Sequence, residues 1–321
     1  MRFIVTGSSG YVGPHLLNRL LEDDHEVYAL YRTNYEDTVD VLKYNFIKIK
    51  WIQGDLTDYS RIENVFKSRK FEGCFHLSGM VHPPTAFEQP VMTFKNNALG
   101  TVYLVDALVK YNPFCVLHNC STSEVYGAAK SRITEFHPRL PNNPYSVSKY
   151  ASELYVTEQA GEGKLRAFST RAFSHTGARR RNNFAIASDA YQIALILNGK
   201  QDNFIRIGNM SSVRNVMDVR DTVDVYYQLM MKAIKNQIPN GDIFNICGDE
   251  LHDMMWYLDL MLDIANIKPK LIIDKNLFRK VDIPIQNPDS TKVRKLLNWS
   301  PKIPIRETLT DLINYHIEKT R

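Results

Sequence analysis

The sequence predicts a doubly wound α/β protein, with a parallel sheet between helices and a smaller mixed α/β lobe in the C-terminal half. Two observations predict this fold class. In the first half, short β-branched or apolar runs alternate with amphipathic stretches, which is typical of a parallel sheet covered by helices. A glycine-rich segment, TGSSGYVG, also lies between the first apolar run and the first amphipathic stretch.

The expected elements follow one another in strand and helix order. Each expected strand is a short apolar run bounded by polar or turn residues, and each expected helix carries apolar residues three or four apart. The expected strands are 2–7, 26–32, 46–55, 73–79, 114–121 and 165–173, and the expected helices are 15–23, 60–69, 99–111 and 146–161.

The rest of the chain is richer in loops, Pro and Asn. It carries two long helical patterns, near residues 185–198 and 221–236. We therefore expect one domain over residues 1–170 and a second lobe over residues 171–321, interleaved with the first.

Composition restricts the class of protein. With 321 residues, of which 44% are hydrophobic, the chain can bury a full core in one large or two modest domains. No run approaches the roughly 20 apolar residues of a membrane span. The first strand begins at Arg2, so we expect no signal peptide and a cytoplasmic protein. The formal charge of +5 is modest and gives no reason to expect a nucleic acid partner.

The cysteines suggest neither disulfides nor a metal site. Cys74, Cys115, Cys120 and Cys247 show no CxxC spacing and no paired framework. We expect small core side chains at these positions and no bound metal.

The glycine-rich segment predicts a dinucleotide site of the Rossmann type. Its glycines are three residues apart, which permits a tight turn and a close backbone approach, and the helix that follows offers its amides to a pyrophosphate. The strand before it and the helix after it make the signal specific. The residues expected to contact the dinucleotide here are Gly7, Gly10, Tyr11, Val12 and Gly13.

Other strand ends supply further candidate cofactor contacts. Asp55, in GDLTD, either meets the adenine amine or forms an ordinary surface turn. Arg32 ends the second strand with no acid until Glu36, which favours NADP over NAD, although NAD remains open. The remaining candidates are Leu56, Leu77, Ser78, Gly79 and Asn97.

A candidate reactive centre lies in the segment PYSVSKYASE. Tyr145 and Lys149 are four residues apart at the start of an expected helix, so they share one face. We expect the ammonium to stabilise the phenolate and to lower the tyrosine pKa from about 10 towards neutrality. Such a tyrosine can remove a hydroxyl proton while a hydride passes to nicotinamide.

The combination of TGxxGxxG, Asn97 in NNALGT, the strand end STSEVYG and YxxxK resembles the extended short-chain dehydrogenase/reductase family of nucleotide-sugar enzymes. The resemblance implies that Tyr145 is the base and that Lys149 also holds the nicotinamide ribose. It implies a hydroxyl at Thr122 that bonds the oxygen at sugar C4, with Ser123 and Glu124 beside it. It also implies a homodimer.

Two branches of this family share finer features with the chain. AFEQP, TSE and RRRNNF resemble GDP-mannose 4,6-dehydratases, whereas IRIGNMSSVRNVMDVRD and the C-terminal tail resemble GDP-4-dehydro-6-deoxy-mannose reductases. Both branches take GDP-linked, manno-configured sugars, and in both a pair of arginines binds the diphosphate, which implies Arg214 and Arg279 in this chain. The positions implied for substrate binding are His82, Ser174, Arg180, Asn183, Asn209, Arg214 and Arg279.

One departure concerns the sugar. The relatives usually read FNH after the sixth strand, whereas this chain reads FSH, so that Ser174 replaces an amide. The sugar is accordingly expected to be a hexose or a heptose.

The sequence leaves three functions open. The first is an NAD(P)-dependent oxidoreductase acting at C4 of a GDP-linked manno-configured sugar, as a 4-keto reductase or a 4-dehydrogenase. The second is a GDP-sugar 4,6-dehydratase with Glu124 as the base at C5, although Glu124 could equally shape its own turn. The third is an inactive dinucleotide-binding sensor, against which the intact Thr122, Tyr145 and Lys149 argue.

Overall fold

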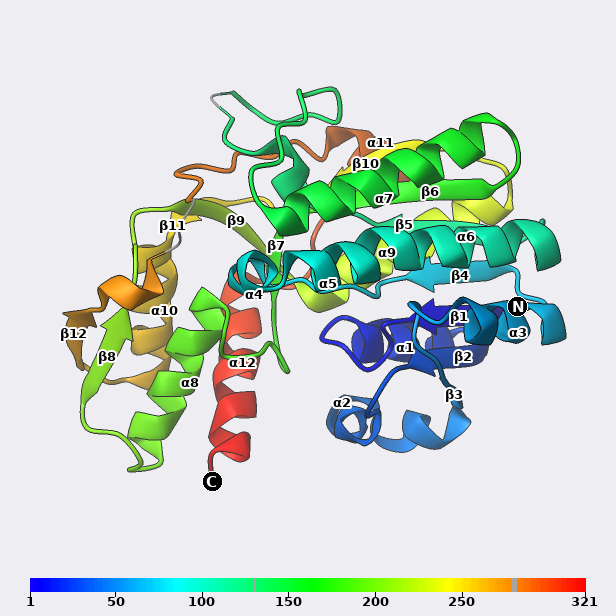
Figure 1. Cartoon of the computed structure of the whole chain (residues 1–321). Coiled ribbons are helices and arrows are strands. Elements are labelled where there is room, and N and C mark those ends of the chain that lie inside the picture. Colours follow the sequence, from blue (N-terminus) through cyan, green and yellow to red (C-terminus); the bar gives the residue numbers. More distant parts are fainter. Residues whose placement is uncertain (130, 279–281) are drawn as a thin grey trace.

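The computed structural model describes residues 1–129, 131–278 and 282–321. Its largest feature is a parallel sheet of seven described strands in the order β10-β6-β5-β4-β1-β2-β3 (Figure 1). These strands are β1 (Arg2–Thr6), β2 (Glu26–Tyr31), β3 (Lys50–Gln53), β4 (Gly73–His76), β5 (Val116–Cys120), β6 (Arg166–Ala172) and β10 (Asp242–Ile246). The strand order reverses between β1 and β4, and ligands of such sheets bind at the carboxyl ends of the strands at that point.

Helices cover both faces of this sheet, because side chains alternate along each strand. Phe3 and Val5 of β1 point into one core with α1 and α9, while Ile4 points into the other with α3, α6 and α7. The bounds of these helices are α1 (Gly13–Glu22), α9 (Val219–Ile234), α3 (Tyr59–Ser68), α6 (Gly100–Tyr111) and α7 (Pro144–Gly161). The doubly wound class is therefore confirmed.

Short helices connect the strand ends. They are α2 (Val39–Leu42), α4 (Pro83–Glu88), α5 (Pro90–Phe94), a π-helical turn at Lys95–Leu99, and 3₁₀ helices at Glu36–Thr38, Lys43–Lys48, Ser123–Tyr126 and Lys275–Leu277.

A smaller lobe lies beside the large sheet (Figure 1). Two small sheets, β11-β9-β7 and β12-β8, pack with three helices around a separate core. The strands are β7 (Ser174–Thr176), β8 (Phe204–Ile207), β9 (Val213–Asp218), β11 (Leu251–Asp253) and β12 (Lys270–Ile273), and the helices are α8 (Ala185–Leu197), α10 (Met254–Ala265) and α12 (Ile305–Lys319). Between lobe elements the chain returns to the large sheet through α9, β10 and α11 (Thr291–Leu297).

The expected elements differ from the observed ones at the edge strand β3 and in the C-terminal half of the chain. The strand expected over 46–55 begins only at Lys50, because β3 is the edge strand and pairs with β2 over residues 50–53 alone. Helices α10 and α12 and strand β10 were not predicted.

Among the described residues, no helix has the length and apolar character needed to cross a bilayer.

Candidate active site

The glycine loop after β1 is packed against neighbouring backbone. Gly7 has a φ of +69°, and a Cβ there would lie 2.7 Å from the backbone N of Ser78. A Cβ on Gly13 would lie 2.2 Å from the backbone O of Ser8. The amide of Gly10 donates to the carbonyl of Gly7 at 3.0 Å, which closes the turn. The loop therefore has the shape that lets a ligand approach the backbone closely.

The N-terminus of α1 also suits a pyrophosphate. Its N-cap is Val12, whose apolar side chain cannot accept hydrogen bonds from the first amides of the helix. Those amides remain available to an anion. The residues present therefore fit a bound dinucleotide.

The loop after β4 lies against the glycine loop, and Asn97 holds it in place. Asn97 is fully buried and accepts from the amide of Met80 at 2.7 Å. Its side-chain N–H groups donate to the carbonyl of Met80 at 3.0 Å and to Ser148 Oγ at 2.9 Å. A Cβ on Gly79 would lie 2.8 Å from Asn97 Oδ1. Since both donors of the amide are used within the protein, Asn97 ties Leu77–Met80 to α7.

The candidate adenosine contacts lie at the ends of β2 and β3. Arg32 is exposed and donates to Asn96 Oδ1 at 3.2 Å. Asp55 accepts from the amide and hydroxyl of Thr57 at 2.8 and 2.9 Å through one oxygen, so it does shape a turn. Leu56 is buried, with its Cβ beside Gly100.

Three of the expected catalytic side chains converge. Thr122 follows β5, and its hydroxyl hydrogen-bonds with that of Tyr145, the second residue of α7. Lys149 lies one turn further along α7 and is 3% exposed, and within the described part of the chain its ammonium makes no hydrogen bond or ion pair. A buried ammonium of this kind needs a polar partner, which ribose hydroxyls can supply.

Ser123 and Glu124 lie in the 3₁₀ helix after Thr122. Ser123 is buried, whereas Glu124 is partly exposed and accepts from Asn143 Nδ2 at 2.8 Å. Asn143 is also the N-cap of α7, with a reciprocal pair of bonds to Ser146. The two segments that carry the site are thus joined through one asparagine.

The electrostatics of Tyr145 differ from the sequence expectation. Burial raises the pKa of its phenol above the usual value, and the negative charge of Glu124 raises it further. The hydrogen bond from Thr122 and the positive charge of Arg180 act in the opposite direction. Burial also lowers the pKa of Lys149. The expected lowering of the Tyr145 pKa is therefore wrong for this structure, because burial of the phenol raises it.

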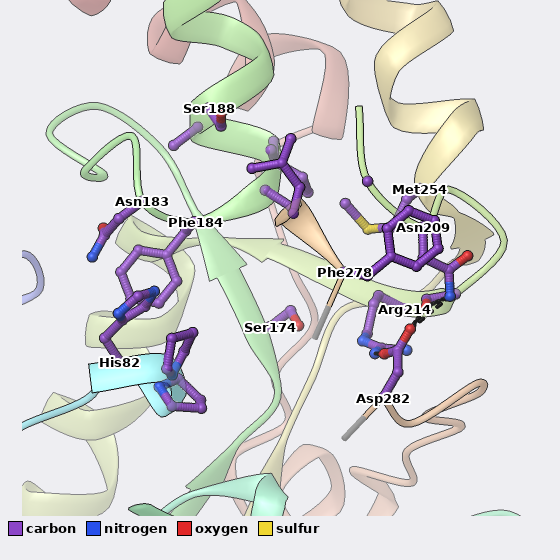
Figure 2. A pocket seen from close by; sticks show the side chains of 18 of the residues that line it. His82, Ser174, Asn183, Phe184, Ser188, Asn209, Arg214, Met254, Phe278 and Asp282 are labelled. Carbon is purple, nitrogen blue, oxygen red and sulfur yellow. Dashed lines mark hydrogen bonds and ion pairs between the residues drawn. The ribbon is translucent and has the colours of Figure 1, made fainter. Parts of the chain in front are cut away.

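A cavity of about 620 Å³ lies beside this centre, between the large sheet and the smaller lobe. Glu124 and Asn143, at the junction of β5 and α7, line it from the large sheet, and residues of α8, β9 and the start of α10 line it from the smaller lobe. Figure 2 shows His82, Ser188, Arg214 and Met254 around this cavity. Its volume suits a ligand of the size of a nucleotide sugar.

Most of the expected substrate residues line this cavity. His82 Nδ1 lies 2.9 Å from Thr85 Oγ1, and the His82 ring meets Phe184 edge-on at 5.5 Å. Ser174 in β7 and Asn183 before α8 also line it (Figure 2).

Arg180 projects between two aromatic rings. Its guanidinium carbon lies 3.6 Å from the ring centre of Phe184 and 4.7 Å from that of Tyr11. It faces no carboxylate within 4 Å among the described residues, and burial lowers its pKa. His175 stacks on Tyr11 at 6.0 Å and joins this cluster to the glycine loop. A buried arginine arranged in this way can receive an anionic or hydroxyl-rich ligand.

A second polar cluster lies on the other side of the cavity. Arg214 donates to Asp282 Oδ1 at 3.2 Å, and Asn209 Nδ2 donates to Asp282 Oδ2 at 2.6 Å (Figure 2). Arg214 therefore already contacts a carboxylate, which a diphosphate would share or displace. Arg279, the other expected diphosphate ligand, lies outside the described residues.

The sequence reading missed several residues around the cavity. Asn143 could have been found, because Asn before Pro at a helix start is a capping signal. Phe184, Asp189, Met254 and Asp282 carry no local signal that marks them. Among the described residues, His, Cys, Asp and Glu side chains form no metal-binding group of three or more.

Known proteins resemble this chain over almost its full length. The chain is 27% identical to the GDP-6-deoxy-D-mannose reductase of Pseudomonas aeruginosa, covering 98% of this chain and 96% of that one. It is 26% identical to the GDP-6-deoxy-D-talose 4-dehydrogenase of Aggregatibacter actinomycetemcomitans, covering 92% and 91%. A solved structure of RMD from Pseudomonas aeruginosa complexed with NADPH has a TM-score of 0.82 and 25% identity, covering 99% of each chain.

The family model described as GDP-mannose 4,6 dehydratase matches residues 4–312, which include the glycine loop, the Tyr145 centre and the cavity. The chain therefore belongs to the GDP-mannose 4,6-dehydratase family, within the extended short-chain dehydrogenase/reductases.

Proposed function

We propose that this protein is an NAD(P)-dependent oxidoreductase that acts at C4 of a GDP-linked, manno-configured hexose or heptose. It works as a 4-keto reductase or, in the reverse direction, as a 4-dehydrogenase. The observation that carries the proposal is the position of the Thr122 hydroxyl beside the buried phenol of Tyr145, one helical turn from Lys149, whose buried ammonium has no partner among the described residues.

The names of the relatives support C4 of the sugar as the carbon that reacts. A reductase and a 4-dehydrogenase that both bear GDP-6-deoxy-sugar names are similar to this chain over more than nine-tenths of its length.

The bound nicotinamide would accept or supply the hydride. Tyr145 would move the proton of the C4 hydroxyl, and Thr122 would hold that oxygen in line with it. Lys149 would hold the ribose, whose hydroxyls would satisfy its buried ammonium.

Binding would involve both sides of the cavity. We assign the α1 N-terminus to the cofactor pyrophosphate, and Arg214 to the diphosphate of the sugar nucleotide. His82, Ser174, Arg180, Asn183 and Asn209 would contact the substrate, and Arg32 favours NADP because no acid ends β2.

A second candidate, 4,6-dehydration, is supported by one residue. Glu124 lines the cavity and its charge acts on Tyr145, which supports a role for its carboxylate as a base beside the same sugar. Its hydrogen bond from Asn143, however, joins the turn after β5 to the start of α7, so Glu124 would have a structural role in an oxidoreductase as well as in a dehydratase.

The proposal includes a cytoplasmic homodimer. All four cysteines, which lie in described segments, are unpaired, as is usual in a reducing compartment. Val91 and Phe94 of α5 and Val147 and Leu154 of α7 are exposed apolar side chains on neighbouring helices, a face that a second copy would cover. Sedimentation velocity would test this, and a monomer mass would contradict it.

The test of the chemistry is a mass balance. The protein is incubated with a GDP-manno-sugar and oxidised NAD(P), while nicotinamide absorbance is followed. We expect the sugar to lose two hydrogens, to keep every oxygen, and to change in step with the absorbance. Loss of water from the sugar without net cofactor reduction would establish dehydration instead.

A further inference from the structure

One buried carboxyl beside the cavity has no assigned use. Asp189 lies in the middle of α8 between Ile186 and Ile193 and is only 5% exposed. Throughout the described ranges, it makes no hydrogen bond and no ion pair within 4 Å. Burial raises the pKa of its carboxyl to about 8. A carboxyl placed in this way is costly unless a ligand satisfies it.

Asp189 lines the cavity from helix α8 of the smaller lobe. Figure 2 shows Ser188, its neighbour in sequence, at the upper edge of the cavity and His82 at the lower edge. Asp189 lines the same cavity from α8, so it lies on the smaller-lobe side, whereas Glu124 lies on the large-sheet side.

Apolar side chains in the wall of the cavity suit a flat heterocycle. Ile186 of α8, Met210, Met254 of α10 and Phe278 all line the cavity and present apolar or polarisable surfaces. Sulfur and aromatic side chains of this kind pack well against a ring. A nucleobase packed against these side chains could present its polar edge to the carboxyl of Asp189, which lines the same cavity.

The chemistry of a carboxylate selects among the bases. Guanine carries two adjacent donors, N1–H and the N2 amino group, on the edge that the ribose does not occupy. Both oxygens of an ionised carboxylate can accept these two bonds, and accepting them favours the ionised form over the protonated form that burial favours in the free protein. Uracil offers one N–H between two carbonyls, and adenine offers an amine beside an acceptor nitrogen, so each would leave a repulsive contact.

We propose that Asp189 selects the guanine base, accepting hydrogen bonds from N1–H and N2–H through its two carboxylate oxygens. This inference rests on the proposed function, since it names the group that distinguishes a GDP-sugar from other nucleotide sugars.

The test is calorimetric titration of the full chain with GDP, IDP, ADP and UDP. IDP is the informative ligand, because it lacks only the N2 amino group. We expect the wild-type protein to bind GDP about tenfold more tightly than IDP, the effect of one hydrogen bond to a charged group, and to bind UDP and ADP more weakly still.

The variant Asp189→Asn keeps the shape of the side chain but replaces one acceptor by a donor. It should bind GDP about 10- to 100-fold more weakly and bind GDP and IDP with nearly equal affinity. Asp259→Asn is the matched control, because Asp259 is an exposed aspartate of α10 in the same lobe. Its GDP affinity should equal that of the wild type. Unchanged NADPH affinity in both variants checks that they are folded.

The outcomes separate the two proposals. If the wild type prefers GDP and Asp189→Asn keeps both the affinity and the preference over IDP, the role of Asp189 is overturned while the function stands. If the wild type prefers UDP or ADP, both the base assignment and the GDP-sugar function are overturned.

Discussion

Tyr145 shows how the protein prepares one residue for proton transfer. Tyr145 is 8% exposed, and the charges of Glu124 and Arg180 act on the pKa of its phenol in opposite directions. Burial and Glu124 hold the proton on the phenol, so positive charge must arrive before it can act as a base. An oxidised nicotinamide carries such a charge when bound.

Replacing Tyr145 by Phe should lower turnover by about 10²- to 10⁴-fold, the usual effect of removing a general acid–base group. NADPH affinity should stay near that of the wild type, since the hydroxyl faces Thr122. Steady-state kinetics and a cofactor titration measure both quantities. Tyr155→Phe, a change on the same helix at a tyrosine packed against the core of α3 and α6, should leave turnover unaltered. Equal turnover in Tyr145→Phe and the wild type would remove Tyr145 from the mechanism.

Single residues were predictable from the sequence only where a local pattern marks them. Tyr145 and Lys149 are one helical turn apart, and Thr122 follows a strand, so the sequence alone could bring them together. Asp189 lies in an apolar helical pattern, and its burial depends on the fold of the smaller lobe rather than on its neighbours in the chain. The direction of the Tyr145 pKa shift was missed for the same reason, because desolvation is a property of the whole fold.

Among the elements, the link from β1 to α1 is the most constrained. Gly13 begins α1 directly against the carbonyl of Ser8, and the clash of an added Cβ would be with backbone, which cannot rotate away.

Gly13→Ala should therefore destabilise the protein by about 1–3 kcal/mol, the usual cost of overpacking. It should also weaken NADPH binding, because the shifted loop no longer presents the α1 amides. Thermal unfolding and a cofactor titration would show this. At Gly161, the last residue of α7, an added Cβ would meet no described atom within 4 Å, so Gly161→Ala should leave NADPH binding unchanged. Identical NADPH affinity in Gly13→Ala and the wild type would contradict the assignment of the loop.

The elements of the large sheet were more predictable than those of the smaller lobe. The strands β1, β2, β4, β5 and β6 are buried apolar runs that are visible in the sequence. The edge strand β3 was predicted too long, because an edge has one partner and its pairing ends where β2 ends. α10 and α12 were not predicted, because the Pro and Asn residues around them indicate loops, although their apolar side chains share a core with α8.

At the scale of the whole molecule, two buried histidines connect the glycine loop and α1 to the segment that contains β7 and Ala178. His15 of α1 contacts the carbonyl of Ala178, and His175 of β7 stacks on Tyr11. Burial lowers the pKa of each to about 4. Both imidazoles are therefore neutral in the folded protein over most of the physiological range.

Acid should therefore lower the free energy of unfolding over a defined range of pH. The unfolded chain binds protons at these histidines near pH 6.5, whereas the folded chain binds them only near pH 4. The free energy of unfolding should fall as pH drops from about 6.5 to 4, by on the order of 3 kcal/mol for each histidine at most. Urea unfolding at pH 7 and pH 5 would measure the fall, and His15→Gln should make it smaller. A free energy of unfolding that does not fall between pH 7 and pH 5 would contradict the buried neutral imidazoles.

The central claim, hydride transfer between sugar C4 and nicotinamide with release of the cofactor, is tested most directly with a GDP-manno-sugar deuterated at C4. After incubation with oxidised NAD(P), mass spectrometry of both products locates the label. The account predicts one deuterium in each reduced nicotinamide and none in the oxidised sugar. Deuterium at C6 of a dehydrated sugar would contradict it in favour of a 4,6-dehydratase, and deuterium that stays at C4 would contradict it in favour of a protein without turnover.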